Sequence, residues 1–306
     1  MRQYHRAGQT SRTKAVLELV LALVFAFVIM AIAISIETGT FGVKKLKELP
    51  TEIRTFTTIV NLAVLAPGAL LAAMACGRRA GSLWSVTSRI RWRWLATCLL
   101  AALAVRAIAP VLVALDLAFG RKDFVGVAAY LPRLAMLLVL VPLQATGEEL
   151  FFRGTVMQTV GSFTRSAWPP IVISTALFTL AHGLRPELAL AIAPVGLATA
   201  WLTIRTGGLE AAMGYHIVLN TVGLAVQLAI AGGKRGINEH PTYAGAVVSV
   251  VFAGVYVLVA LRLAKRLAAG SDQVEQDPPE RRVGVEHPDH GGDAEALAPQ
   301  QQQPGG

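Results

Sequence analysis

A chain of 306 residues, of which 54% are hydrophobic and 15% are charged, is too apolar for an ordinary soluble protein. Its charged residues stand in short clusters between long apolar runs, a pattern typical of polytopic helical membrane proteins. Residues 1–269 carry a net charge of +15, which lies in loops beside those runs without interleaved aromatic residues. We therefore expect a lipid bilayer as partner and no nucleic acid. Its two cysteines, Cys76 and Cys98, offer neither a disulfide framework nor a zinc spacing.

Apolar segments of membrane-spanning length recur along the chain. The first runs from about Ala15 to Ile36 and is too long for the hydrophobic region of a typical signal peptide, so we interpret it as a retained span. The following spans are expected at residues 57–76, 95–115, 130–158, 169–184, 188–204, 208–231 and 243–264. The sequence therefore predicts an all-α fold, a polytopic membrane helix bundle of about eight transmembrane helices.

Composition and charge also divide the chain and orient it. Residues 1–129 hold the N-terminal transmembrane helices, residues 130–231 a core with buried polar motifs, and residues 232–269 the last transmembrane helix. Residues 270–306 combine Pro, Gly and Gln with eight acidic residues against two arginines, which predicts a disordered acidic tail. Fifteen basic residues on the N-terminal side of the membrane against nine on the other side place both termini in the cytoplasm.

An acidic pair interrupts the apolar run that ends near Leu143. Glu148 and Glu149 stand next to each other, and Arg153 follows Glu149 by four residues, the spacing of an i,i+4 ion pair on a helix. Glu148 points about 100° away from Glu149 and is free for chemistry. The structural alternative is a capped helix end with a simple salt bridge. Ionisable groups at membrane depth are more often functional, and they are usually paired and turned inward.

Two histidines lie inside later apolar runs. His182 follows Phe178 by four residues, and Asn220 follows His216 by four, so each pair shares one helix face. At a rise of about 1.5 Å per residue, Glu148, His182 and His216 lie roughly 15, 21 and 12 Å from the same membrane face. Three helices thus place polar groups at similar depths. A single buried histidine is more often a satisfied core residue, but a cluster of this kind indicates a site.

These motifs resemble a known family. Glu-Glu-x-x-x-Arg, Phe-x-x-x-His and His-x-x-x-Asn, in this order on successive membrane helices, are similar to the CAAX-protease and bacteriocin-processing (CPBP, or Abi) family. Its members are intramembrane endopeptidases related to the type II CAAX prenyl endopeptidases. The resemblance covers about residues 130–230 and implies that residues 130–231 are the catalytic core of a multi-pass protein of the cell membrane. High Ala, Gly, Val and Arg content favours a bacterial plasma membrane.

The resemblance also implies roles for the motif residues. Glu148 and His182 would hold and activate a water molecule, while His216 and Asn220 would supply donors to that water or to the oxyanion. Glu149 and Arg153 are expected to support the helix, and Phe178 to pack beside the site.

The cofactor requirement stays open at this point. A metal-independent, glutamate-type protease is favoured, because the chain has no His-Glu-x-x-His motif and each candidate ligand comes from a different helix. The alternative is a metalloprotease that binds a divalent ion such as zinc through Glu148, His182 and His216.

Other functions remain alternatives. Buried Glu and His residues also serve transporters and proton relays, although clear inverted repeats are missing from the sequence. A non-catalytic family member is the third interpretation. As an enzyme, the protein would cleave a membrane protein or a membrane-associated peptide, whose identity the sequence does not reveal.

Overall fold

The computed structural model describes residues 3–8, 11–49, 51–120, 123–230 and 243–276. The chain divides into two units, Met1–Ala264 and Lys265–Gly306, and the first contains the helical bundle. Across the described ranges the regular elements are helices, and extended pairing is limited to two isolated bridges.

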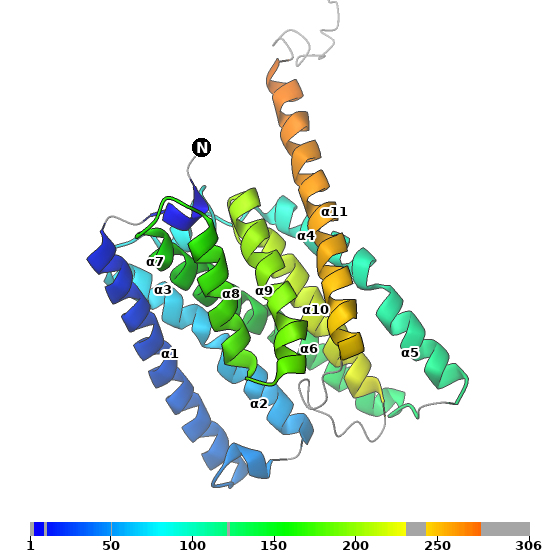
Figure 1. The fold of residues 1–306 in the computed structure, drawn as a ribbon. Helices are drawn as coiled ribbons and strands as arrows, with labels where there is room; N and C mark the ends of the chain where they lie inside the picture. The colour runs from blue at the N-terminus through cyan, green and yellow to red at the C-terminus, as the bar shows by residue number, and fades with distance from the viewer. Residues whose placement is uncertain (1–2, 9–10, 50, 121–122, 231–242, 277–306) are drawn as a thin grey trace, which may run out of the picture. The chain divides into compact units, whose positions relative to one another are not determined.

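Several of the helices follow one another through connections of a few residues (Figure 1). In chain order they are α1 (Arg12–Phe41), α2 (Thr51–Ala63), α3 (Leu65–Ala75), α4 (Trp92–Arg106), α5 (Ile108–Ala118), α6 (Val127–Glu149), α7 (Met157–Gly161), α8 (Trp168–His182), α9 (Pro186–Thr206), α10 (Glu210–Ala229) and α11 (Tyr243–Gln276). A π-helix, η4 (Leu150–Val156), joins α6 to α7 without a loop.

The predicted polytopic helical fold is confirmed. Seven described helices or helix pairs are long and apolar enough to cross a membrane. The remaining predicted span, residues 169–184, is present as α8, but its 15 residues reach only about 22 Å, less than a hydrocarbon core of about 30 Å. The predicted spans 57–76 and 95–115 are each divided, between α2 and α3 and between α4 and α5.

The C-terminal prediction is tested only in part. Helix α11 continues to Gln276, so the backbone is helical beyond residue 270, where we expected the disordered tail to begin. Residues 277–306 lie outside the described residues. The orientation of the termini and the domain boundaries stay predictions.

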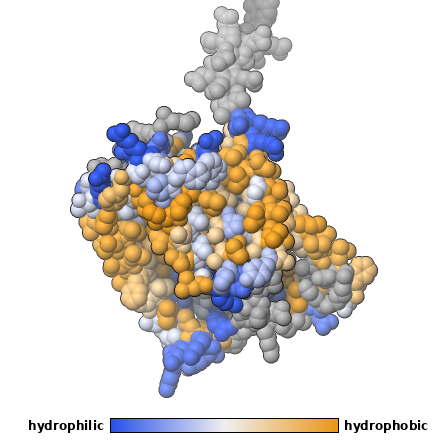
Figure 2. All heavy atoms as spheres, in the orientation of Figure 1, coloured by the Kyte–Doolittle hydropathy of each residue, from blue (hydrophilic) through white to orange (hydrophobic). Residues whose placement is uncertain are grey.

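Packing within the first unit places α10 between α4, α6 and α9, and α9 beside α8. Tyr215 of α10 stacks on Tyr256 of α11, with ring centroids 4.7 Å apart, in a core that also includes α4 and α9. Outward-facing apolar side chains such as Phe27 and Ile36 of α1 are exposed. On the face shown in Figure 2, apolar residues cover the sides of the helices and hydrophilic residues gather at their ends, which is the surface of a multi-pass membrane protein.

Candidate active site

The two carboxylates lie at the end of α6, where this helix passes close to the junction of α2 and α3. Glu148 and Glu149 are buried, with 2% and 0% of their surface exposed. Gly147 permits the close passage, because a Cβ atom there would stand 3.1 Å from the carbonyl oxygen of Ala63 and from the amide nitrogen of Ala66. This backbone contact fixes the height of both carboxylates in the bundle.

Both carboxylates face one imidazole, that of His216 on α10. Its Nδ1 atom lies 2.7 Å from Glu149 Oε1, and its Nε2 atom lies 3.6 Å from Glu148 Oε2. An ionised carboxylate only accepts hydrogen bonds, so Nδ1 donates to Glu149. The Nε2 atom and Glu148 Oε2 are close enough for one water molecule to bond both at about 2.8 Å.

Arg153 of η4 is fully buried beside this acidic pair. Its guanidinium donates to Glu149 Oε1 at 3.2 Å and to the carbonyl oxygen of Gly196 on α9 at 3.2 Å. The guanidinium carbon also lies 4.2 Å from the centre of the Phe178 ring. The expected ion pair between Glu149 and Arg153 is therefore present. Glu149 in addition holds His216, a contact that the sequence did not indicate.

The π-helix sets the position of Arg153. Residues Leu150–Val156 follow the acidic pair directly, and wide turns of this kind occur frequently at functional sites. The hydroxyl of Ser174 on α8 donates to the carbonyl oxygen of Phe152 at 2.8 Å, so the neighbouring helix supplies a partner to the widened turn. Arg153 is thereby directed toward α8 and α9 while it keeps its bond to Glu149.

A buried amide, Gln144, joins Glu148 to Asn220. Its Nε2 atom donates to Glu148 Oε1 at 2.6 Å, and its Oε1 atom accepts from Asn220 Nδ2 at 3.1 Å. We did not predict Gln144 from the sequence. The signal that would have found it is its position one helical turn before Glu148, on the same face of α6.

His182 closes α8 at the edge of the site. Its Nδ1 atom lies 2.8 Å from the carbonyl oxygen of Phe178, so Nδ1 donates and Nε2 remains an acceptor in the neutral ring. The Phe178 ring contacts both imidazoles, with centroids 4.5 Å from His182 and 5.7 Å from His216. No hydrogen bond joins His182 to Glu148, although both residues are described.

The helix that carries His216 is fixed from two sides. At its start, Glu210 accepts three hydrogen bonds of 2.6–2.9 Å from the backbone and guanidinium of Arg91. One turn further, Gly214 lies against α4, and a Cβ atom at this position would come within 2.8 Å of Cys98 Cβ. These contacts hold α10 at a fixed height, so the contact between His216 and the carboxylates is set by the packing of the bundle.

The candidate metal ligands are Glu148, His182 and His216. Among the described residues there is no group of three His, Cys, Asp or Glu side chains that could hold an ion. His182 Nδ1 is bonded to a backbone carbonyl and His216 Nδ1 to Glu149, so in each ring Nε2 is the nitrogen that could face an ion.

Comparison with known proteins bears on the same segment. Residues 130–222, which contain every candidate site residue, match the family model described as type II CAAX prenyl endopeptidase Rce1-like. An uncharacterised protein of Bacillus subtilis (strain 168), YyaK, is 30% identical over 139 residues, which make up 40% of this chain and 46% of that protein. The chain thus matches about half the length of this curated relative. No solved structure matches. The resemblance predicted from the motifs is confirmed: residues 130–222 are similar to the Rce1-like type II CAAX prenyl endopeptidases.

Proposed function

We propose that this protein is an intramembrane endopeptidase that hydrolyses a peptide bond in a membrane-associated protein or peptide. The main support for the proposal comes from the surroundings of Glu148 Oε2. This buried carboxylate oxygen has no hydrogen-bond partner and lies 3.6 Å from His216 Nε2. No protein group bonds this oxygen, so it is available to hold the water molecule that peptide hydrolysis needs. The family match supports the same assignment.

In the proposed reaction Glu148 is the general base. A water molecule bonded to Glu148 Oε2 gives one proton to the carboxylate, and its oxygen attacks the carbonyl carbon of the substrate. The tetrahedral intermediate then collapses. Its carbon–nitrogen bond breaks, and the leaving nitrogen takes the proton from Glu148, so the carboxylate is restored for the next turnover.

The surrounding side chains orient the water and stabilise the oxyanion. Glu149 fixes the ring of His216 through Nδ1, which directs Nε2 toward the reacting water. Asn220 keeps a second amide hydrogen beyond the one it gives to Gln144, and this hydrogen is available to the oxyanion. We assign His182 to the substrate side of the same water through Nε2, since its Nδ1 is held by Phe178.

A comparison of membranes tests this function and does not require that the substrate be identified first. Cells with the wild-type chain are compared with cells that carry Glu148→Gln, which keeps the size of the side chain but removes the base. Glu187→Gln serves as the control, because Glu187 lies at the start of α9, outside the site. We expect an uncut precursor to accumulate with Glu148→Gln alone. Identical membrane proteomes for wild type and Glu148→Gln would contradict the proposal.

The metal requirement is tested on the purified protein. The proposed mechanism uses only side chains and water, so treatment with a strong chelator should leave the cleavage rate unchanged. A loss of rate that zinc restores would instead establish the metalloprotease alternative, with Glu148, His182 and His216 as the ligands.

A further inference from the structure

The amide of Gln144 lies at a point where the acidic pair and the oxyanion donor meet. Its side chain is buried, with 4% of its surface exposed, and both ends of the amide are bonded. One end contacts Glu148 on its own helix and the other contacts Asn220 on α10. Gln144 is thus the direct polar link between the proposed base and Asn220.

The hydrogen bonds from Asn220 through Gln144 to Glu148 can donate in only one direction. An ionised Glu148 oxygen only accepts, so Gln144 must present its NH₂ group to Glu148 and its carbonyl oxygen to Asn220. Asn220 must then present its own NH₂ group to Gln144. The orientation of both amides therefore follows from the charge on Glu148.

This direction makes the two oxygens of Glu148 unequal. Oε1 accepts the 2.6 Å bond from Gln144, whereas Oε2 faces His216 Nε2 and has no hydrogen-bond partner. A carboxylate oxygen that already accepts a short hydrogen bond is a poorer base than its free neighbour. The reacting oxygen is thereby Oε2.

We propose that Gln144 is a positioning residue for the peptidase reaction: it selects Glu148 Oε2 as the base and, by accepting one hydrogen of the Asn220 NH₂ group, directs the second hydrogen toward the oxyanion. The inference rests on the proposed function and deepens it. Gln144 itself need not touch the substrate, because it acts through Glu148 and Asn220.

Two substitutions test this role on the purified full chain in proteoliposomes, with the precursor found in the membrane comparison as substrate. Gln144→Met keeps the length of the side chain but removes both hydrogen bonds. We expect kcat to fall about a hundredfold, since small misplacements of catalytic groups have effects of that order, while KM changes by less than about threefold. An unchanged kcat would overturn the inference.

Gln144→Glu supplies a pH signature that a purely structural role does not produce. The new carboxyl group can donate to Glu148 only while it is protonated, so kcat should recover at acidic pH relative to wild type measured at the same pH. The other ionisable groups around the site are Glu148, Glu149, Arg153, His182 and His216, and the ratio to wild type removes their common effect. Gln144→Met should show no such recovery. A ratio of Gln144→Glu to wild-type kcat that does not change with pH would overturn the inference, and this comparison does not require Gln144→Met to fold.

Gln158 provides the matched control. It is also a buried glutamine with both amide ends bonded, to Arg78 and to the carbonyl oxygen of Ser82, but it lies outside the site. Gln158→Met should lower thermal stability and leave kcat and its pH profile as in wild type. Absence of any cleavage by the wild type would refute the proposed function. If the wild type cleaves the precursor and Gln144→Met does so with an unchanged kcat, the positioning role alone is refuted.

Discussion

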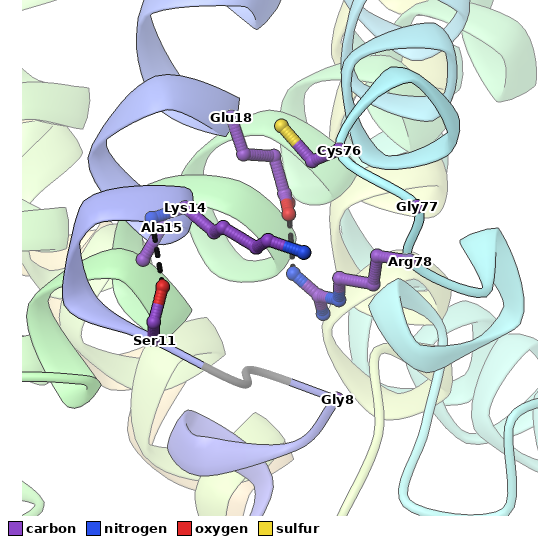
Figure 3. A pocket seen from close by; sticks show the side chains of 8 residues that line it. All are labelled: Gly8, Ser11, Lys14, Ala15, Glu18, Cys76, Gly77 and Arg78. Atoms are coloured by element: carbon purple, nitrogen blue, oxygen red, sulfur yellow. Dashed lines mark hydrogen bonds and ion pairs between the residues drawn. The ribbon is translucent and has the colours of Figure 1, made fainter.

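Two buried polar networks in this bundle differ in how completely they are bonded. The Arg78 network consists of Glu18 on α1, Arg78, Ser82 and Gln158, and it ties the start of α1 to the loop after α3 and to α7. Figure 3 shows Glu18 and Arg78 directed at each other, with Lys14 and Cys76 lining the same small pocket. The Glu148 network consists of Gln144, Glu148, Glu149, Arg153, His216 and Asn220.

The two networks differ in whether their buried nitrogen and oxygen atoms all have hydrogen-bond partners. For the Arg78 network, as far as the structure describes it, no buried side-chain nitrogen or oxygen lacks a hydrogen-bond partner, and the ion pair of Arg78 with Glu18 is 2.7 Å long. The Glu148 network leaves the Oε2 atoms of Glu148 and Glu149 and the Nε atom of Arg153 without partners. A fully bonded network stabilises the fold, whereas buried groups without a protein partner are available to bind a water molecule or a substrate.

The largest expected effect separates the two networks by activity. Glu148→Gln should lower the cleavage rate by about 10²–10⁴-fold, the usual contribution of a general base, with little change in thermal stability. Glu18→Gln, at an equally buried glutamate of the other network, should leave the rate per folded molecule unchanged. Rate assays and thermal unfolding on both purified variants check this pair. Equal losses of rate in the two variants would contradict the distinction.

The second effect separates them by stability. Arg78→Met leaves Glu18 buried without its cation, which should cost about 3–5 kcal/mol in the free energy of unfolding. Replacing both residues, as Arg78→Met with Glu18→Leu, should restore most of that loss because no unpaired charge remains. Unfolding in detergent measures both. A double variant no more stable than Arg78→Met would show that the ion pair is not the source of the loss.

A smaller effect is expected at Gly147. A Cβ atom there would meet backbone atoms of Ala63 and Ala66, which have no flexible end that could move aside. Gly147→Ala should therefore destabilise the protein by about 1–3 kcal/mol and also lower kcat, because α6 must shift and take Glu148 with it. Gly254→Ala on α11 is the control, since no atom lies within 4 Å of its added Cβ. A stable, fully active Gly147→Ala would show that this contact does not set the site.

The smallest effect concerns pH and the segment before α1. Burial lowers the pKa of His5 from its ordinary value of 6.5, so the unfolded chain binds this proton more readily than the folded one. The stability linked to His5 is thus fully present above pH 6.5 and is lost as pH falls below it. His5→Gln should reduce the loss of thermal stability on acidification. An unchanged slope of stability against pH in this variant would contradict the prediction.

The sequence predicted the helical membrane fold and the motifs of the candidate site, because hydropathy and i,i+4 spacing are local properties. It did not predict the breaks at Val64 and Ala107 or the π-helix. A long apolar run has the same hydropathy whether the span is one continuous helix or two helices separated by a break. Gln144 was missed for a related reason. Periodicity shows which face a residue occupies, but its partner Asn220 is 76 positions away in the chain, and only packing brings the two together.

The most direct measurement follows the oxygen of the attacking water. Purified wild-type protein and Glu148→Gln are reconstituted in proteoliposomes and incubated with the precursor in water enriched in heavy oxygen. If Glu148 activates water for peptide hydrolysis, the new C-terminal carboxylate of the wild-type product carries one heavy oxygen atom, and Glu148→Gln forms this product at least about a hundredfold more slowly. Unlabelled product, or labelled product formed by Glu148→Gln at the wild-type rate, would contradict the assignment of Glu148 as the base.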